Sequence, residues 1–337
     1  MIDLRSDTVT KPTQAMRKVM ADAEVGDDVW GDDSSVNRLE AYAAEITGME
    51  AGLFVPSGTQ SNLVGILSHC QRGEEYIVGQ QAHTYKYEGG GAAVLGSIQP
   101  QPIELEPDGT MPLEKIRAVI KPDDFHYAIS KLLCLENTIG GKVLPMEYIS
   151  AATSLASDHK LGNHLDGARL FNAVVRLGCK ATDITRFFDS VSICLSKGLG
   201  APVGSVLCGP ADFIKTGRRW RKMLGGGMRQ AGIIAAAGLY ALENNIDRLA
   251  EDHDNAALLG KALAEIDELD VSLQTMHTNM VFFKPRDGRV EELTDHLASR
   301  EILIEPGSEI RLVTHMQVSA EDVLATAEAI KAFYQQS

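Results

Sequence analysis

Cysteine is scarce in this sequence. The chain of 337 residues has five cysteines, an odd number, and no two of them form a C-x-x-C pair: Cys70, Cys134, Cys179, Cys194 and Cys208. We interpret them as reduced thiols of a cytoplasmic protein, most of them buried as small apolar side chains. A catalytic cysteine is the less favoured alternative.

Long hydrophobic runs are missing as well. The first residues, MIDLRSDTVTK, carry charge from the third position and lack the apolar centre of a signal peptide. The longest weakly polar stretch, residues 231–242, is too short to span a membrane. Internal repeats, low-complexity segments and a polybasic tail are also absent from the sequence. We therefore expect a soluble protein with no membrane partner.

Positive charge is in deficit. The 32 Lys and Arg residues face 46 Asp and Glu residues, which gives a formal net charge of -14. Repulsion from phosphates argues against nucleic acid or an anionic membrane surface as the main partner. The deficit is counted over the whole chain, so a small pocket can still carry positive charge. An apolar content of 44% and the chain length predict a globular protein of about two domains.

Short apolar strands alternate with helices through most of the chain. Strands are expected at residues 52–55, 76–78, 132–135, 161–165, 190–195 and 205–208, and helices at 13–22, 36–47 and 61–69. Runs such as VSICL and SVLC lack polar alternation, as expected of strands buried on both faces. The pattern predicts an α/β fold with a mostly parallel, doubly wound sheet.

The pattern changes near residue 245. A long helix at 246–266 precedes strands at 279–283 and 310–313 and helices at 290–299 and 320–334. We expect a large domain over residues 1–245 and a smaller α+β domain over 246–337. Residues 1–12 are expected to be extended, because Thr8, Val9 and Thr10 are β-branched and Pro12 follows. The arm 1–15 can pack on either domain.

The segment PSGTQSN, residues 56–62, lies between an expected strand and an expected helix. Backbone N–H groups at a helix start, bared by Gly58 and joined by the hydroxyls of Ser57 and Thr59, form a cradle for phosphate. An ordinary capped helix start is the alternative, and this segment alone favours it. The glycine patterns of a P-loop and of a dinucleotide site are absent.

The segment HLDGAR, residues 164–169, follows at the end of another expected strand. Strand alternation puts His164 and Asp166 on the same side, at the carboxyl end, where open α/β sheets bind ligands. A carboxylate there can hold a pyridinium nitrogen protonated. A metal pair of His164 and Asp166, or an aspartate that caps the next helix, explains this segment equally well.

Lys197 follows directly after the apolar strand at 191–195. A lone buried ammonium is costly, so desolvation favours the free amine, which is a nucleophile toward an aldehyde. The glycines at 198 and 200 let a large group approach. A lysine in a surface turn is the alternative. One cofactor accounts for all three segments by its phosphate, ring nitrogen and aldehyde: pyridoxal 5'-phosphate (PLP), held as a Schiff base on Lys197.

Over nearly its whole length the chain resembles the low-specificity L-threonine aldolases, which belong to the PLP enzymes of fold type I. The resemblance is carried, in order, by DLRSDTVT, GDDVWGDD, FVPSGTQSN, LCLENT, LDGARLFNA, SICLSKGLGAPVGS, RWRKMLGGGMRQ, EDHDNA, TNM and RLVTH. It implies retro-aldol cleavage of L-threonine, L-allo-threonine and related β-hydroxy-α-amino acids to glycine and an aldehyde. It also implies a homo-oligomer, most often a tetramer built as a dimer of dimers.

The resemblance assigns roles to particular residues. Lys197 matches the Schiff-base lysine and Asp166 matches the partner of the pyridine nitrogen. His83 matches the imidazole that stacks on the ring, and His126 matches a second histidine near the β-hydroxyl. Ser57, Gly58, Thr59 and Arg229 match residues that bind the cofactor phosphate, and Lys222 matches one that does so across a subunit boundary. Ser6, Arg169 and Arg311 match residues around the substrate carboxylate and the ring hydroxyl.

Two positions depart from the family's usual pattern. Ile139-Gly140 stands where His-Asn is usual, and Trp30, expected to border the substrate pocket, stands where Tyr is more common. His83 and His126 both remain candidates for the base that deprotonates the β-hydroxyl. Transamination or β-elimination on the same scaffold is the nearest alternative function. A non-enzymatic binding module with a structural Lys197 is the alternative from another class.

Overall fold

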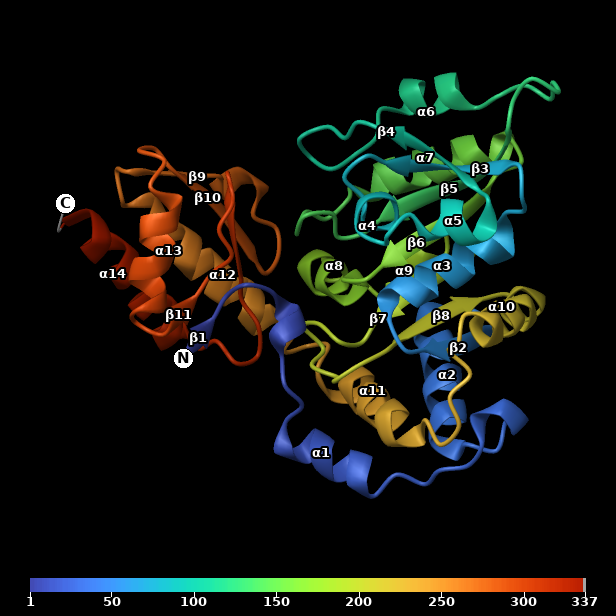
Figure 1. Ribbon diagram of the computed structural model, residues 1–337, viewed down its shortest axis with the longest axis horizontal. Helices are drawn as coiled ribbons and strands as arrows, with labels where there is room; N and C mark the ends of the chain where they lie inside the picture. Colours follow the sequence, from blue (N-terminus) through green and yellow to red (C-terminus); the bar gives the residue numbers. More distant parts are fainter. Residues whose placement is uncertain (336–337) are drawn as a thin grey trace.

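The computed structural model describes residues 1–335 of the chain. Within this range, seven strands form the central sheet of the larger part in the order β2-β8-β7-β6-β5-β3-β4 (Figure 1). These strands are β2 (Ala51–Val55), β3 (Glu74–Gly79), β4 (Gln99–Ile103), β5 (Ile129–Glu136), β6 (Gly162–Gly167), β7 (Ser190–Cys194) and β8 (Ser205–Gly209). β3, β4, β5, β6 and β7 pair in parallel, and β8 pairs antiparallel with both β7 and β2. The predicted α/β fold with a mostly parallel sheet is confirmed.

Helices cover both faces of this sheet, which explains the apolar runs without alternation. Leu53 and Val55 of β2 pack with Val64 of one helix and Ile214 of another, whereas Phe54 joins the main core on the opposite side. The helices of the larger part are α1 (Gln14–Ala21), α2 (Ser34–Thr47), α3 (Gly58–His69), α4 (His83–Lys86), α5 (Gly91–Gly96), α6 (Leu113–Val119), α7 (Met146–Asp158), α8 (Leu170–Leu177), α9 (Ala181–Thr185), α10 (Ala211–Met223) and α11 (Gly232–Asn244).

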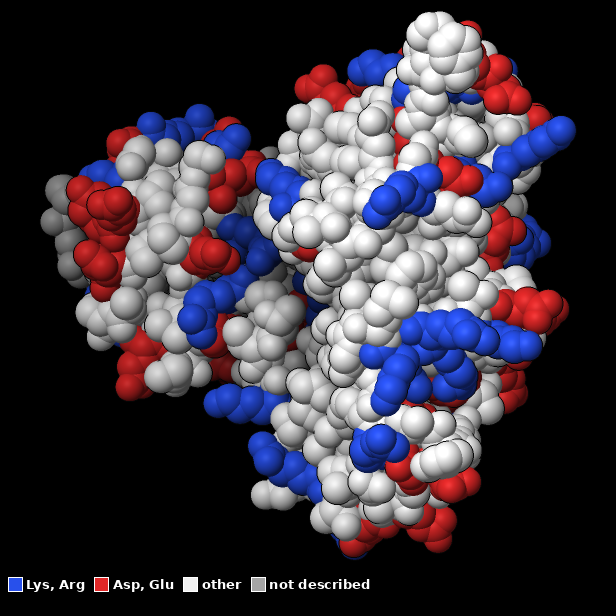
Figure 2. Space-filling view, turned by 45° about the vertical axis from the view of Figure 1, so that its right-hand side comes forward, with Lys and Arg blue, Asp and Glu red and all other residues white. Residues whose placement is uncertain are grey.

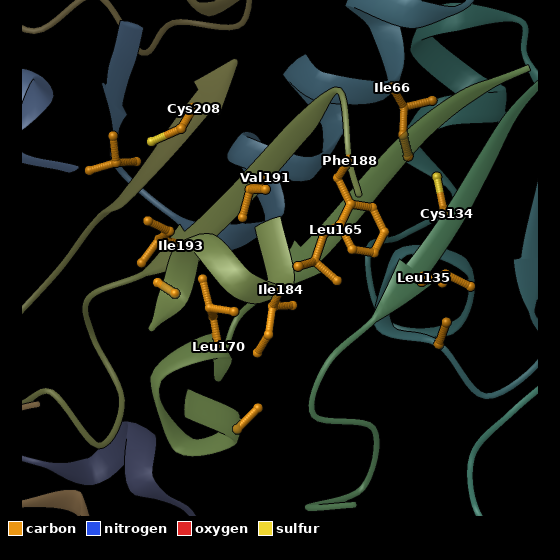
Figure 3. Close-up of a cluster of buried hydrophobic side chains, with 14 of the residues drawn as sticks. Ile66, Cys134, Leu135, Leu165, Leu170, Ile184, Phe188, Val191, Ile193 and Cys208 are labelled. Atoms are coloured by element: carbon orange, nitrogen blue, oxygen red, sulfur yellow. The ribbon is translucent and has the colours of Figure 1, made fainter. Parts of the chain in front are cut away.

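Part of the main core lies where the middle strands meet α8 and α9. Figure 3 shows Leu165 of β6 and Val191 and Ile193 of β7 beside Leu170 of α8 and Ile184 of α9. All five side chains are fully buried. Burial of such a side chain stabilises the fold by roughly 1.5–3 kcal/mol. This packing holds the carboxyl ends of β6 and β7 at fixed positions.

The C-terminal part has a sheet and a core of its own. Strands β9 (Leu269–Val271), β10 (Met280–Pro285) and β12 (Ile310–Val313) form an antiparallel sheet against α12 (Leu249–Ala264), α13 (Val290–Ala298) and α14 (Ala320–Gln335). Their buried side chains form a second cluster, separate from the main core. We propose that the two clusters mark two domains divided near residue 245, as the change of pattern predicts.

The N-terminal arm connects the two parts. β1 (Ile2–Asp3) pairs in parallel with β11 (Ile302–Leu303), so the chain starts beside the C-terminal helices before it crosses to α1 under α11 (Figure 1). The Thr10 hydroxyl then donates a hydrogen bond of 3.0 Å to the Lys197 carbonyl of the larger part. The arm therefore contacts both parts rather than one.

One sequence-based expectation is wrong in detail, and one strand was not predicted. Residues 7–9 form a 3-10 turn instead of an extended strand, because the Ser6 side chain accepts a hydrogen bond from the Thr8 N–H and Asp7 is buried. The strand β4 was not predicted, because its QPQPI segment contains two prolines. Proline cannot donate to a strand ladder, and β4 lies at the edge of the sheet, where this is tolerated. None of the helices within residues 1–335 has the length and apolar character that a membrane crossing requires.

Candidate active site

The carboxyl ends of β5, β6 and β7 bring polar residues into one row. In the sheet register, Glu136 is opposite Asp166, and Asp166 is opposite Ser192. The chain leaves β7 two residues later and reaches Lys197. Since ligands of parallel sheets bind at the carboxyl ends of the strands, this row marks the candidate site.

Lys197 is half-buried in the turn after β7. Its carbonyl accepts hydrogen bonds from the Thr10 hydroxyl and from the Gly200 N–H, at 3.0 and 2.8 Å, which fix the turn. A Cβ at Gly198 would approach the Leu249 side chain to 2.8 Å, so packing favours glycine there, and Gly200 has φ +80°, a backbone conformation that favours glycine. The positive charge of Lys197 adds to the lowering of the pKa of Asp7, and it opposes the larger effects that raise the pKa of Glu136 and of His83.

Asp166 is the next-to-last residue of β6 and is only 2% exposed. One carboxylate oxygen accepts the Ala168 N–H at 3.0 Å, and the other accepts the Asn62 side-chain N–H at 2.9 Å. Within residues 1–335, no Lys, Arg or His side chain forms an ion pair with it. Neutral donors alone therefore hold this buried carboxylate, which leaves acceptor capacity for a positively charged ligand.

His83 and Glu88 form a second acid–base pair beside Asp166. The His83 Nδ1 atom lies 2.8 Å from Glu88 Oε1, and the Asn62 amide donates to that same oxygen at 2.9 Å. Ligand atoms of His83, Glu88 and Asp166 all lie within 4.8 Å of one another. The hydrogen bond that His83 donates to Glu88 raises the pKa of His83. Burial raises the pKa of Glu88, and the nearby Asp166 charge adds to this effect.

Glu136 completes the acidic side of the site. One of its oxygens accepts the backbone N–H of His83 at 2.7 Å, which anchors the start of α4 to the end of β5. Burial raises the pKa of Glu136, and repulsion from Asp166 raises it further. Three carboxyl groups, one imidazole and one amine therefore meet at adjacent strand ends, an arrangement suited to moving protons.

The segment 57–59 starts α3 at the same edge of the sheet. The Ser57 hydroxyl caps the helix by accepting the Gln60 N–H at 3.1 Å. As at every helix start, the first N–H groups have no partner within the helix. A Cβ at Gly58 would meet only Ser205 Oγ and Cys194 Sγ, at 3.6 and 3.9 Å. Packing inside the protein therefore does not require glycine at this position. The Ser205 hydroxyl is buried and lacks a partner within residues 1–335.

Arg169 follows β6 and is held by the N-terminal arm. It donates two hydrogen bonds to Asp7, at 2.8 and 2.6 Å, and the Asn279 amide also reaches Asp7 at 3.3 Å. Burial acts to raise the pKa of Asp7, but the Arg169 guanidinium outweighs it and the pKa is about 2. Arg311 of β12 is half-buried and donates to the Arg5 carbonyl at 3.2 Å. Ser6 precedes Asp7 and caps its turn.

Several predicted residues lie outside this cluster in the single chain. His126 is exposed on the loop before β5, where it hydrogen-bonds Asp124 at 2.7 Å and stacks on Phe125. Trp30 is 77% exposed. Lys222 is exposed near the end of α10, and Arg229 forms an exposed ion pair with Asp27 at 2.8 Å. Their predicted roles remain predictions.

The sequence reasoning missed four residues of the cluster: Asp7, Asn62, Glu88 and Glu136. Asp7, Asn62 and Glu136 stand inside segments that carry the family resemblance, and Glu88 stands five residues after His83, so proximity to these segments and to His83 was the available signal. A metal-binding pair of His164 and Asp166 was one alternative interpretation of the sequence. In the structure both of its ring nitrogens are hydrogen-bonded, to Ser190 at 2.8 Å and to Asn62 at 3.3 Å.

Comparisons with known proteins agree with this arrangement. The family model described as "Beta-eliminating lyase" matches residues 3–286. The chain is 57% identical over 333 residues to a low specificity L-threonine aldolase of Escherichia coli, covering 99% of both chains. It is 45% identical to low-specificity L-threonine aldolase 1 of Arabidopsis thaliana, covering 96% of this chain and 93% of the relative. A solved threonine aldolase of Leishmania major superposes with a TM-score of 0.84 at 21% identity, covering 99% of both chains, which shows a shared fold.

Proposed function

Because this chain belongs to the beta-eliminating lyase family, as one of its low-specificity L-threonine aldolases, we propose that it cleaves L-threonine and L-allo-threonine to glycine and acetaldehyde, with PLP held between Lys197 and Asp166. The reaction is reversible, and related β-hydroxy-α-amino acids are also substrates. One observation carries the proposal: an amine lies in the turn after β7, and a buried carboxylate without an ion-pair partner among residues 1–335 lies near the end of the neighbouring strand β6. A PLP molecule needs these two groups at opposite ends of its ring.

The residues present fit PLP at three points. Lys197 offers the amine that holds the aldehyde carbon, and Asp166 has acceptor capacity for the protonated ring nitrogen. The bare helix start at Gly58 and Thr59, with the hydroxyls of Ser57 and Ser205, offers donors to a phosphate. His83 stands beside Asp166, where its flat ring can stack on the cofactor. When bound, PLP supplies an electron sink for the pair of electrons released at the substrate α-carbon.

The chain's own residues orient the substrate and move the proton. Arg169 and Arg311, with Ser6, hold the substrate carboxylate, since a planar guanidinium binds a carboxylate through two parallel hydrogen bonds. This grip sets the Cα–Cβ bond at the angle that cleavage requires. His83 accepts the proton of the β-hydroxyl at Nε2, directly or through a water, because its Nδ1 is already engaged by Glu88. His126 is the alternative base, supplied by a second subunit.

We further propose that the enzyme is a homotetramer, built as a dimer of dimers. Large apolar side chains are exposed near Lys222 and along α5, among them Trp30, Tyr87, Val94, Leu95 and Met223. Figure 2 shows a broad area of uncharged residues over the larger part, bordered by a row of Lys and Arg side chains. In such an assembly, Lys222 and Arg229 contribute to a neighbouring phosphate site. With five free cysteines, the cytoplasm is the proposed location.

Product analysis tests the proposed function. The purified enzyme, loaded with PLP, is incubated with L-threonine and the products are identified by mass spectrometry. Glycine and acetaldehyde in equal amounts support the proposal. 2-Oxobutanoate with ammonia would establish β-elimination instead, and an amino-group transfer to an added oxo acid would establish transamination.

A further inference from the structure

A chain of hydrogen bonds between buried and half-buried side chains leads to Asp166 from the side of the sheet covered by α3. The His69 Nε2 atom lies 2.7 Å from the Ser190 hydroxyl, and Ser190 lies 2.8 Å from His164 Nδ1. His164 Nε2 lies 3.3 Å from the Asn62 carbonyl oxygen. The Asn62 amide nitrogen then lies 2.9 Å from both Asp166 Oδ2 and Glu88 Oε1. The retro-aldol mechanism uses none of the first four groups.

The sequence of α3 allows this chain to form. A Cβ at Gly65 would lie 2.9 Å from the His164 ring, so only glycine lets the helix come this close to β6. Asn62 stands three residues earlier on the same helix face and reaches both His164 and Asp166. His164 and Ser190 are partners in the register of β6 and β7, which places their side chains together on that face.

The direction of the chain is fixed at its Asn62 end. Two carboxylates can only accept, so both N–H groups of Asn62 point to Asp166 and Glu88. Its carbonyl oxygen then faces His164, which must carry its proton on Nε2. Burial lowers the pKa of His164 to about 3 and that of His69 to about 4, so both rings are neutral near pH 7. Ser190 therefore donates to His164 Nδ1 and accepts from His69 Nε2.

Every donor in the chain consequently points toward the two carboxylates. We propose that Asn62 is a positioning residue, held in place by His164, whose amide keeps Asp166 and Glu88 ionised and aimed into the site. The inference rests on the proposed role of Asp166 as the partner of the cofactor ring. It assigns to His164 the support of Asn62 rather than metal binding.

The charges around the pair explain why a shared donor matters. Glu136 from β5 faces Asp166 as a third carboxyl, and repulsion between the two raises the pKa of Glu136. His83 and Lys197 are the cations that face this group from α4 and from the turn after β7. Without the Asn62 amide, Asp166 and Glu88 would repel each other across a short gap, and one of them would retain a proton at higher pH.

Two substitutions at His164 separate support of Asn62 from simple packing. In His164→Gln, the side-chain amide can place an N–H at the position of Nε2. In His164→Asn, the shorter amide reaches only the position of Nδ1. Asn62→Ala removes the shared donor, and Ser68→Ala, whose hydroxyl bonds only within α3, is the matched control. We expect Asn62→Ala and His164→Asn to lower kcat about 10- to 100-fold, the cost of a hydrogen bond to a charge. Their KM should change less, and the acid limb of their pH profile should move to higher pH.

His164→Gln and Ser68→Ala should retain the wild-type pH profile. Equal kinetics for the Gln and Asn variants, or an unmoved acid limb in Asn62→Ala, would overturn the proposal. One measurement needs neither variants nor cofactor: ¹⁵N NMR of the histidine rings in PLP-free wild-type protein. We expect a neutral His164 ring protonated on Nε2, and a proton on Nδ1 would overturn the direction of the chain. If wild-type enzyme fails to cleave threonine, the proposed function fails while this ring measurement keeps its meaning.

Discussion

Asp7 and Arg169 form a two-pronged ion pair across 162 positions of sequence: the guanidinium donates to both carboxylate oxygens, at 2.8 and 2.6 Å. The pair ties the N-terminal arm to the turn after β6, the strand that carries Asp166. It fixes the plane of the guanidinium, which is the geometry that recognition of a substrate carboxylate needs. The arm is therefore part of the site and not merely a packing element.

Breaking this pair should destabilise the protein. Asp7→Asn leaves the buried Arg169 charge without its counterion, and we expect the free energy of unfolding to fall by about 3–5 kcal/mol. Asp3→Asn, which breaks a more exposed pair with Arg5, is the control and should cost far less. Urea unfolding measures both variants. Equal losses would contradict the structural role given to Asp7.

The stability of the fold should fall when the pH falls below about 6.5. His164 stays neutral in the folded state until about pH 3, whereas an unfolded histidine gains a proton near pH 6.5. The unfolded state therefore binds more protons between these values, and stability is full above this window and lost as the pH falls through it. In His164→Gln, the free energy of unfolding, measured in urea, should change with pH less steeply, by up to about 1.4 kcal/mol per pH unit. An unchanged slope would show that His164 titrates normally.

Two glycines of α3 should respond differently to the same substitution. Gly65→Ala forces a Cβ to within 2.9 Å of the His164 ring, and overpacking of this kind costs about 1–3 kcal/mol of stability. Gly58→Ala adds a Cβ at ordinary contact distance, so stability should stay nearly constant while the affinity for PLP falls. Thermal unfolding of the PLP-free variants and equilibrium dialysis with PLP measure the two effects. A PLP affinity in Gly58→Ala equal to that of the wild type would contradict the phosphate cradle.

The His83–Glu88 pair predicts a shift in pH dependence. The Glu88 hydrogen bond raises the pKa of His83, so Glu88→Gln should lower that pKa and move the corresponding limb of the kcat profile to lower pH. His83→Phe should keep PLP bound and lose most turnover. The profile of the Gln variant and the visible spectrum of the Phe variant are the measurements. Full cleavage activity in His83→Phe would leave His126 as the remaining candidate base.

A site shared between subunits predicts that two inactive variants complement each other. Lys197→Ala removes the amine from its own site, and Lys222→Ala removes a cation from a neighbouring one. Mixed oligomers contain some sites with both residues intact, so unfolding and refolding the two variants together should restore part of the activity. Each variant refolded alone is the control. If mixed oligomers form and activity stays at the level of the controls, Lys222 acts within its own subunit.

The strands and most helices could be predicted from the sequence because burial on both faces leaves an unmistakable apolar run. The run VSICL, for instance, led to a predicted strand at residues 190–195, and β7 spans Ser190–Cys194. β4 was missed because its edge position tolerates the two prolines that argue against a strand. The 3-10 turn at residues 7–9 was missed because one of its two causes, the burial of Asp7 against Arg169, depends on a partner far away in sequence.

The same limit applies to the candidate site. Lys197 and Asp166 could be selected because each directly follows a predicted strand, and neighbouring strand ends must lie together. Glu136 also directly follows a predicted strand and was overlooked, whereas Asn62 and Glu88 carry no local signal of this kind, since an ordinary helix or loop residue looks the same. Their part in the cluster arises from strand order and from the close approach that Gly65 permits, which only the three-dimensional fold provides.

A covalent bond between PLP and Lys197 is the central claim of the proposed function. The PLP-loaded protein is treated with borohydride, digested, and the peptides are examined by mass spectrometry. We predict a pyridoxyl group on the peptide that contains Lys197, at one group per chain, and none in Lys197→Ala. A modified lysine elsewhere, or no modified peptide in active enzyme, would contradict the central claim.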